Sequence, residues 1–388
     1  MHSANSRVTL NITEANETLE TAKSLLTESD YLAVASYLVI LGIIAILANS
    51  FVIFVLLKGE VSYYRIHKKL LLNIAIADLM LSLIAFPFFA SSSFANRWLF
   101  SDIGCTFAGF WIFLLAQNDM NTHAAIAVYR YIIICQPSYE YYLKRKNASL
   151  YILGTVWGHT LLFTGLPLVG WSRYQQEAFG TSCTIAWDDN RPAELAYNIV
   201  IIIACYCVHV VIFIFCYYKI INEFSSAKRC LARLREEVIT DRETLRLELM
   251  LKYHKVMTYR KVTVASLAMV AAFMIAWTPY AILGAYVMYD TNVPAWVLLT
   301  PTMFAKSSTV LSPLSCALFS GSFRTAAKQL FCKNEEVLDE VQNGSVLRPL
   351  ASNHSSPEFV QKEVRVTLYK GELTINDIFV GNFDNMEL

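Results

Sequence analysis

The chain has 388 residues, of which 55% are hydrophobic and only 16% are charged. Soluble domains carry about 25% charged residues, so this composition indicates a protein that buries much of its surface in lipid. The net charge of +1 excludes the large basic excess with which proteins displace counterions from nucleic acid, and we expect no nucleic-acid partner.

Apolar residues gather in seven blocks, each long enough to cross a bilayer, which takes about 20 helical residues. The blocks span residues 34–58, 70–94, 103–135, 150–171, 195–222, 262–288 and 296–320. An open sheet would leave backbone groups unpaired in lipid, so the blocks predict helices. The predicted fold class is all-α, a seven-transmembrane helix bundle.

Positive charge is concentrated in the connections after the first, third and fifth blocks, while the other connections are short or acidic. By the positive-inside rule, the N-terminus lies outside and the C-terminus lies in the cytoplasm. We predict a multi-pass protein of the plasma membrane with an extracellular segment, residues 1–33. This segment lacks the pattern of a cleavable signal peptide. Two sequons make Asn11 and Asn16 predicted glycosylation sites.

Nine cysteines are present, and only Cys105 and Cys183 fall in predicted extracellular positions. Because that compartment is oxidising, we expect the pair to form a disulfide bond. The other seven cysteines lack the spacing of metal ligands, so we predict no metal site.

The seventh block contains one charged residue, Lys306, near its middle. A lysine inside the membrane is costly and is a functional-site hypothesis by default. Three interpretations stay open from the residues alone: a snorkelling side chain, an ion pair with a buried acid, or an amine condensed with an aldehyde.

After the seventh block, apolar and basic residues segregate over residues 321–332, which predicts a short amphipathic helix on the membrane surface. Cys332 at its end is a predicted palmitoylation site. The predicted domains are therefore the extracellular segment, a bundle over 34–320, this helix, and a cytoplasmic tail over 333–388.

Several motifs together resemble those of a rhodopsin-like G-protein-coupled receptor, over about residues 34–332. They are the outer cysteine pair, Arg130-Tyr131 at the end of the third block and Trp277-Thr278-Pro279 in the sixth. Within that family, Phe304-Ala305-Lys306-Ser307-Ser308, seven residues before Pro313, resembles the retinal-attachment signature of opsins. The resemblance implies retinal, 11-cis or all-trans, bound covalently to Lys306 as a Schiff base.

The same resemblance assigns roles to other residues. Trp277 and Tyr280 belong to the retinal pocket, and Arg130, Tyr131 and Pro313 belong to the G-protein switch.

A protonated Schiff base needs a counterion, because a nearby acid favours the charged form. Vertebrate visual pigments carry a glutamate three residues after the disulfide cysteine, where this chain has Ala108. Many other opsins use a glutamate six residues before the loop cysteine, and here that residue is Glu177. The runs Gly180–Ile185 and Asn96–Phe100 are similar to the peropsin and retinochrome branch.

The resemblance also implies a polar core formed by Asn49, Asp78 and Asp119, with Asp119 one turn from the helix-two acid. Two adjacent carboxylates in a low dielectric cannot both stay charged without a partner. We expect this pair to share one proton or one cation.

The switch motifs depart from the family pattern. Tyr129 and Tyr259 stand where acids restrain Arg130, His209 replaces a proline, and Ser312–Cys316 replaces an Asn-Pro-x-x-Tyr motif. An unrestrained switch has a smaller gap between its states, so we expect high activity in the dark and a small increment in light.

These features predict a light-sensing receptor that signals through a heterotrimeric G protein, with arrestin, a receptor kinase and membrane lipid as further partners. One alternative is a retinochrome-like photoisomerase that generates 11-cis-retinal, which would make the protein an enzyme. Another is a receptor for a diffusible ligand with an incidental lysine. The degenerate switch favours the photoisomerase, and the long basic connection after the fifth block favours the receptor.

Overall fold

The computed structural model describes residues 26–59, 65–236, 243–291, 293–342, 367–369 and 372–374. The chain forms two compact units, residues 1–335 and 336–388, and each is considered by itself. The predicted glycosylation sites Asn11 and Asn16 lie outside the described residues, as does the side chain of the predicted palmitoylation site Cys332.

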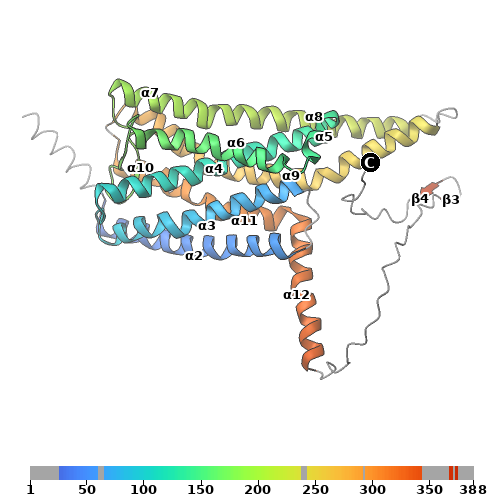
Figure 1. Ribbon diagram of the computed structural model, residues 1–388, viewed down its shortest axis with the longest axis horizontal. Coiled ribbons are helices and arrows are strands. Elements are labelled where there is room, and N and C mark those ends of the chain that lie inside the picture. Colours follow the sequence, from blue (N-terminus) through green and yellow to red (C-terminus); the bar gives the residue numbers. More distant parts are fainter. Residues whose placement is uncertain are drawn as a thin grey trace, which may run out of the picture. The chain divides into compact units, whose positions relative to one another are not determined.

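Long helices running side by side build the first unit, and each of the seven predicted blocks overlaps one helical run (Figure 1). They are α2 (Glu28–Lys58), α3 (Arg65–Phe94), α4 (Asp102–Cys135), α6 (Ala148–Gly165), the continuous run α7 (Pro192–Ile201), η3 (Ile202–Cys207) and α8 (Val208–Glu236), α9 (Glu243–Val287), and the pair α10 (Ala295–Lys306) and α11 (Ser308–Phe319). Short elements η1 (Pro137–Tyr139), α5 (Glu140–Lys144) and η2 (Leu166–Val169) connect them.

Within the described residues, five helical runs are long and apolar enough to cross a membrane by composition alone. They are residues 28–58, 65–94, 148–169, 192–230 and 259–287. The remaining two rods, α4 and α10–α11, carry buried polar side chains such as Asp119, Arg130 and Lys306. Buried polar residues such as Asp119 interrupt the apolar sequence of α4, whereas α10 and α11 are each only 12 residues long because the helix breaks at Ser307.

Helix α4 lies at the centre of the bundle, where it packs against α3, α6, α8 and α9. It also contacts the hairpin formed by β1 (Tyr174–Gln176) and β2 (Cys183–Ile185). The Cys105–Cys183 disulfide ties β2 to the start of α4, with 5.5 Å between the two Cα atoms, and confirms the predicted bond. The hairpin is thereby held over the end of the bundle that holds the candidate site.

The sequence predicted one continuous seventh helix, and this was wrong, because Ser307 divides the rod into α10 and α11. The Ser307 N–H and its hydroxyl both donate to the Phe304 carbonyl, at 3.1 and 2.6 Å. These bonds to the third preceding residue form a tighter turn than the α-helix has. The break therefore falls directly after Lys306.

Leu245 and Leu249 recur at helical spacing before the sixth block, which predicts a helical extension of that block, and α9 does begin at Glu243. The C-terminal helix is longer than predicted, because α12 (Gly321–Gln342) continues past residue 332. The chain has no proline or glycine between residues 332 and 344, so nothing in the sequence ends α12 where its apolar face ends. Early residues of α12 pack on the bundle, since Phe323 lies edge-on to Phe51 of α2, at 6.1 Å between ring centroids.

The second unit contains one described antiparallel pair, β3 (Thr367–Tyr369) and β4 (Glu372–Thr374).

Candidate functional site

Lys306 is buried at the end of α10, with 3% of its surface exposed. Its Nζ lies 5.0 Å from the centroid of the Phe89 ring on α3, and its carbonyl oxygen accepts a 3.0 Å hydrogen bond from the Thr309 hydroxyl. A snorkelling lysine places its head group at the surface of the bundle. The burial of Lys306 excludes that interpretation.

Glu177 lies in the turn of the β1–β2 hairpin. The turn is closed by hydrogen bonds from the Glu177 N–H to the Ser182 carbonyl, at 2.9 Å, and from the Gly180 N–H to the Glu177 carbonyl, at 2.8 Å. Gly180 adopts a positive φ of 74°, which a residue with a Cβ adopts only at a cost. This compact turn fixes where the carboxylate points.

The Glu177 residue is half-buried, but its carboxylate is enclosed. Its Oε1 accepts a 3.3 Å hydrogen bond from the Thr302 hydroxyl of α10, and its Oε2 is buried without a hydrogen-bond partner among the described residues. Burial raises the pKa of Glu177, while the charge on Lys306 and the hydrogen bond from Thr302 partly offset that rise. The structure thus brings the predicted lysine and the predicted acid close enough for their charges to interact.

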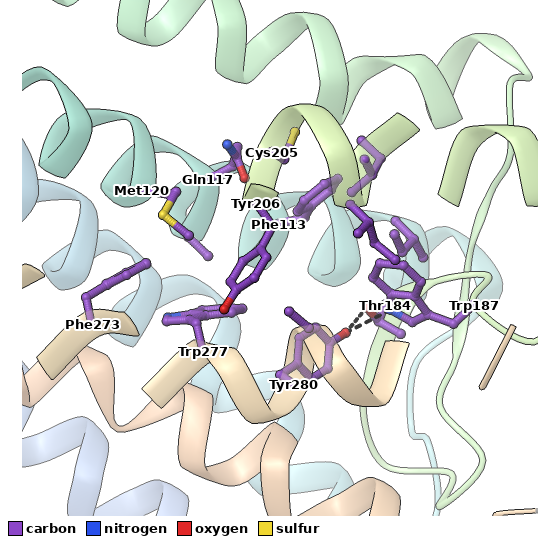
Figure 2. A pocket seen from close by; sticks show the side chains of 15 residues that line it. Phe113, Gln117, Met120, Thr184, Trp187, Cys205, Tyr206, Phe273, Trp277 and Tyr280 are labelled. Carbon is purple, nitrogen blue, oxygen red and sulfur yellow. Dashed lines mark hydrogen bonds between the residues drawn. The ribbon is translucent and has the colours of Figure 1, made fainter. Parts of the chain in front are cut away.

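Both side chains line a cavity of about 40 Å³. A second cavity, of about 90 Å³, lies beside it and is lined mainly by apolar side chains (Figure 2). The two share four lining residues, which are Phe113, Thr184, Trp277 and Tyr280. Together they form an interrupted apolar path that leads from Lys306 toward Met120 on α4.

Hydrogen bonds position the two predicted pocket residues, Trp277 and Tyr280. The Trp277 Nε1 donates to the Ser308 hydroxyl at 3.0 Å, next to the break in the seventh rod. The Tyr280 hydroxyl lies 2.7 Å from the Thr184 hydroxyl and accepts a 3.1 Å bond from the Trp187 Nε1 (Figure 2). Strand β2 and the loop that follows it, which carry Thr184 and Trp187, form the roof of the cavity. Helix α9 is therefore connected both to this roof and to α11.

Phe113, Gln117 and Trp187 are among the residues of the larger cavity that the sequence interpretation did not single out. Phe113 and Gln117 lie at helical spacing with Met120 on α4, so a helical projection of the third block could have found them. Trp187 comes from the loop after β2, and no local pattern predicts that it reaches α9.

The carboxyl groups of Asp78 on α3 and Asp119 on α4 lie close enough to share a hydrogen bond once one of them is protonated, and Ser312 lies beside Asp78. Both acids are buried, with exposures of 1% and 2%. Asn49, predicted in the same core, instead donates its amide to the carbonyls of Ala45 and Thr309, at 2.9 Å each. It therefore fastens α2 to α11.

Arg130 is buried near the C-terminal end of α4, with 2% exposure. Its guanidinium carbon lies 5.6 Å from the centroid of the Tyr129 ring. Tyr131 packs edge-on against Phe215 of α8, at 5.4 Å, and Pro313 is buried within α11. Arg130 therefore lies over the aromatic ring of Tyr129, at the position where the family pattern has an acid.

Comparisons with known proteins agree with this architecture. A family model described as "7 transmembrane receptor (rhodopsin family)" matches residues 48–315. The crystal structure of squid rhodopsin superposes with a TM-score of 0.69 at 21% identity, covering 84% of this chain and 93% of that one. The predicted all-α bundle of seven transmembrane helices is confirmed.

Opsins are among the similar sequences. A rhodopsin of Mizuhopecten yessoensis named as G0-coupled is 32% identical over 308 residues, which cover 78% of this chain and 73% of the relative. Human Opsin-5 is 29% identical over 297 residues, covering 76% and 79%. The mouse visual pigment-like receptor peropsin is 25% identical over 313 residues, covering 79% and 87%. The chain therefore belongs to the rhodopsin family of seven-transmembrane receptors, and within it to the opsins.

Proposed function

We propose that this protein is a light-sensing receptor that holds retinal covalently at Lys306 and signals through a G protein. The observation that carries the proposal is the placement of a buried lysine and a buried carboxylate at one end of an apolar cavity. Receptors for diffusible ligands have no need of this combination, because their ligands are held without a covalent bond.

The residues of the site fit a retinal group. Bound retinal supplies a polyene that isomerises in light, and its aldehyde carbon is the partner for a lysine amine. Lys306 offers that amine within an apolar enclosure, where burial favours the neutral, nucleophilic form. Phe113, Trp277 and Tyr280 supply walls along the path from the amine.

Glu177 is the proposed counterion. The carboxylate and Lys306 line the same cavity, and Oε2 has no competing hydrogen-bond partner among the described residues. In this enclosed site a negative charge stabilises a positive nitrogen more strongly than it does in water. Thr302 holds the other carboxylate oxygen, so the negative charge is oriented from α10, the helix that also carries the lysine.

Trp277 and Tyr280 offer a route from the cavity to the rest of the bundle. Trp277 donates to Ser308 on α11, and Tyr280 joins α9 to the roof. Pro279 lies between them in α9, where it removes one backbone hydrogen bond and favours a kink. A change of ligand shape against these side chains can therefore bias the position of α9, whose other end reaches the cytoplasm in the proposed orientation.

We propose that a heterotrimeric G protein reads this movement beside Arg130, and that arrestin and a receptor kinase act on the same face. One similar protein is named as a G0-coupled rhodopsin, which supports a coupling function. The proposed location is the plasma membrane, with the N-terminus outside.

A photoisomerase remains the second candidate, because Tyr129, Tyr259, Ser312 and Cys316 depart from the motifs of coupled receptors. The two candidates give opposite results in one experiment. The protein is reconstituted separately with 11-cis- and all-trans-retinal, and nucleotide exchange on a panel of G proteins is measured in the dark and in light. Chromatography of the extracted retinal is run in parallel.

The receptor proposal predicts light-dependent exchange on at least one G protein. A visible pigment that gives no exchange on any of them, while all-trans pigment yields mainly 11-cis-retinal after illumination, would support the photoisomerase instead. Absence of a visible band with either isomer would contradict both.

A further inference from the structure

A cavity of about 400 Å³ lies between α8 and α9, toward their cytoplasmic ends. None of its lining residues belongs to the two cavities at Lys306. Its apolar wall includes Ile220 and Phe224 of α8 and Met257 and Leu267 of α9. The volume falls in the range of about 300–1,000 Å³ that is typical of small-molecule sites.

The groove opens toward the lipid-facing side of the bundle. Two of its lining residues are exposed apolar side chains, Ile221 at 52% and Val264 at 46%. Ile214 and Tyr218, on the preceding turns of α8, are 66% and 61% exposed. A contiguous apolar surface on a membrane-spanning helix is covered by acyl chains, so an occupant reaches this groove from the bilayer.

The cytoplasmic end of the groove is basic. Lys228 of α8 and Arg260 of α9 both line it, one from each helix, and both residues are exposed. Ser225 and Tyr253 add hydroxyl groups at this end, and none of the described residues that line the groove is acidic. The lining thus changes along the helices from mainly apolar side chains, with the hydroxyl groups of Tyr217 and Thr263 among them, to two cations with neutral donors.

This gradient matches one kind of molecule, and we propose that the α8–α9 groove binds an anionic phospholipid of the inner leaflet. Lys228 and Arg260 receive the phosphate, and an acyl chain lies along Ile221, Val264 and Leu267. Antiparallel helices place Phe224 and Ser225 near the level of Arg260. At 1.5 Å per residue, Arg260 therefore lies about 10 Å along α9 from Leu267, and Lys228 lies about 16 Å along α8 from Tyr217, which leaves room for the first part of an acyl chain.

The charge pattern favours a lipid over a soluble anion or a peptide. A free phosphate would use the two cations but not the apolar wall. A helix of a cytoplasmic partner would enter from the aqueous side, whereas Ile221 and Val264 open the groove to the membrane. The inference does not depend on retinal binding, because no residue at the retinal site takes part.

The test measures lipid retention by the full-length protein in phosphatidylcholine–detergent micelles. Native mass spectrometry compares the binding of dioleoylphosphatidylserine with that of dioleoylphosphatidylcholine, which has the same acyl chains. We expect selective retention of phosphatidylserine. In K228A/R260A its affinity falls about 30-fold, since each basic side chain near an anionic headgroup contributes roughly a factor of five.

A matched control is available in the neighbouring residues. Arg229 and Lys261 are exposed and follow the two groove cations directly, but neither lines the groove. R229A/K261A removes the same charge and should bind phosphatidylserine as the wild type does. V264W keeps both cations while filling the opening, and it should also lose binding.

Equal losses in the two double variants would overturn the proposal, since they would show a diffuse charge effect. Unchanged binding in V264W would likewise contradict an acyl chain in the groove. Displacement of the lipid by soluble glycerophosphoserine would indicate a phosphate site alone, and displacement by a peptide of a Gα carboxyl terminus would indicate a protein-docking surface.

Discussion

Replacing Glu177 with glutamine tests the electrostatic design of the site most directly. Glutamine keeps the length of the side chain and an oxygen that can accept the Thr302 hydrogen bond, but it removes the negative charge. The change therefore isolates the charge from the shape of the hairpin. We expect the reconstituted pigment to lose its visible band at neutral pH and to absorb in the near ultraviolet.

The size of the effect follows from the enclosure of the pair. Glu177 and Lys306 line one small cavity, and a separation of about 5 Å with an effective dielectric constant of about 20 gives an interaction of roughly 3 kcal/mol. One pH unit corresponds to about 1.4 kcal/mol, so the pH at which the visible form appears should fall by about 2 units. This pH falls in the glutamine variant because the carboxylate stabilises only the protonated nitrogen, and its removal leaves that form less stable.

The assay is a spectroscopic pH titration of the reconstituted protein in the dark. The visible form of the glutamine variant should return on acidification, with its midpoint below that of the wild type. Glu177→Asp serves as the matched control, because it keeps the charge and should keep a visible band at neutral pH. An unchanged spectrum and midpoint in Glu177→Gln would refute the reasoning and point to another acid.

Four other predictions address the remaining parts of the site. Lys306→Ala, expressed at normal levels and offered retinal, should show no visible band, and a band that survives hydroxylamine would contradict the attachment site. Infrared difference spectra should show a protonated carboxyl band that Asp119→Asn abolishes, or thermal stability should depend on sodium. If both effects are absent, Asp119 does not share a proton or a cation with Asp78. Tyr129→Glu should lower nucleotide exchange in the dark if the protein couples to a G protein, and equal dark exchange would argue that no acid is needed there. Tyr280→Phe removes two hydrogen bonds from the roof and should cost about 1–3 kcal/mol in thermal stability, whereas an unchanged melting temperature would show that the roof is held by other contacts.

Sequence reasoning predicted the number of helices and the special status of Lys306 because both are local properties. The seven apolar blocks have the length that a bilayer imposes, whatever their neighbours are. Placing a lysine inside such a block costs free energy in any arrangement of the helices, so the sequence alone marks Lys306 as a candidate functional residue. The charges of the connections predicted that Cys105 and Cys183 share the extracellular side and form a disulfide bond, and that bond is present.

Helix ends and breaks were predicted less well. The division of the seventh transmembrane helix at Ser307 depends on two short-range hydrogen bonds from Ser307 to the Phe304 carbonyl. The apolar pattern of the block does not reveal them. The helical spacing of Leu245 and Leu249 did predict the extension at the start of α9, but the continuation of α12 past residue 332 was not predicted. Leaving the lipid ends an apolar pattern but does not end a helix, since polar residues continue it as readily.

Only the tertiary structure decided which side chains meet. Tyr280 and Trp187 are hydrogen-bonded although 93 residues separate them, and Thr302 reaches Glu177 across 125 residues. Such contacts depend on the rotation of each helix about its axis and on the path of the hairpin, which are set by packing over the whole bundle. The sequence by itself determined that a costly lysine lies in the membrane. Packing alone determined that an enclosed carboxylate, an apolar path and a lipid-facing groove lie where they do.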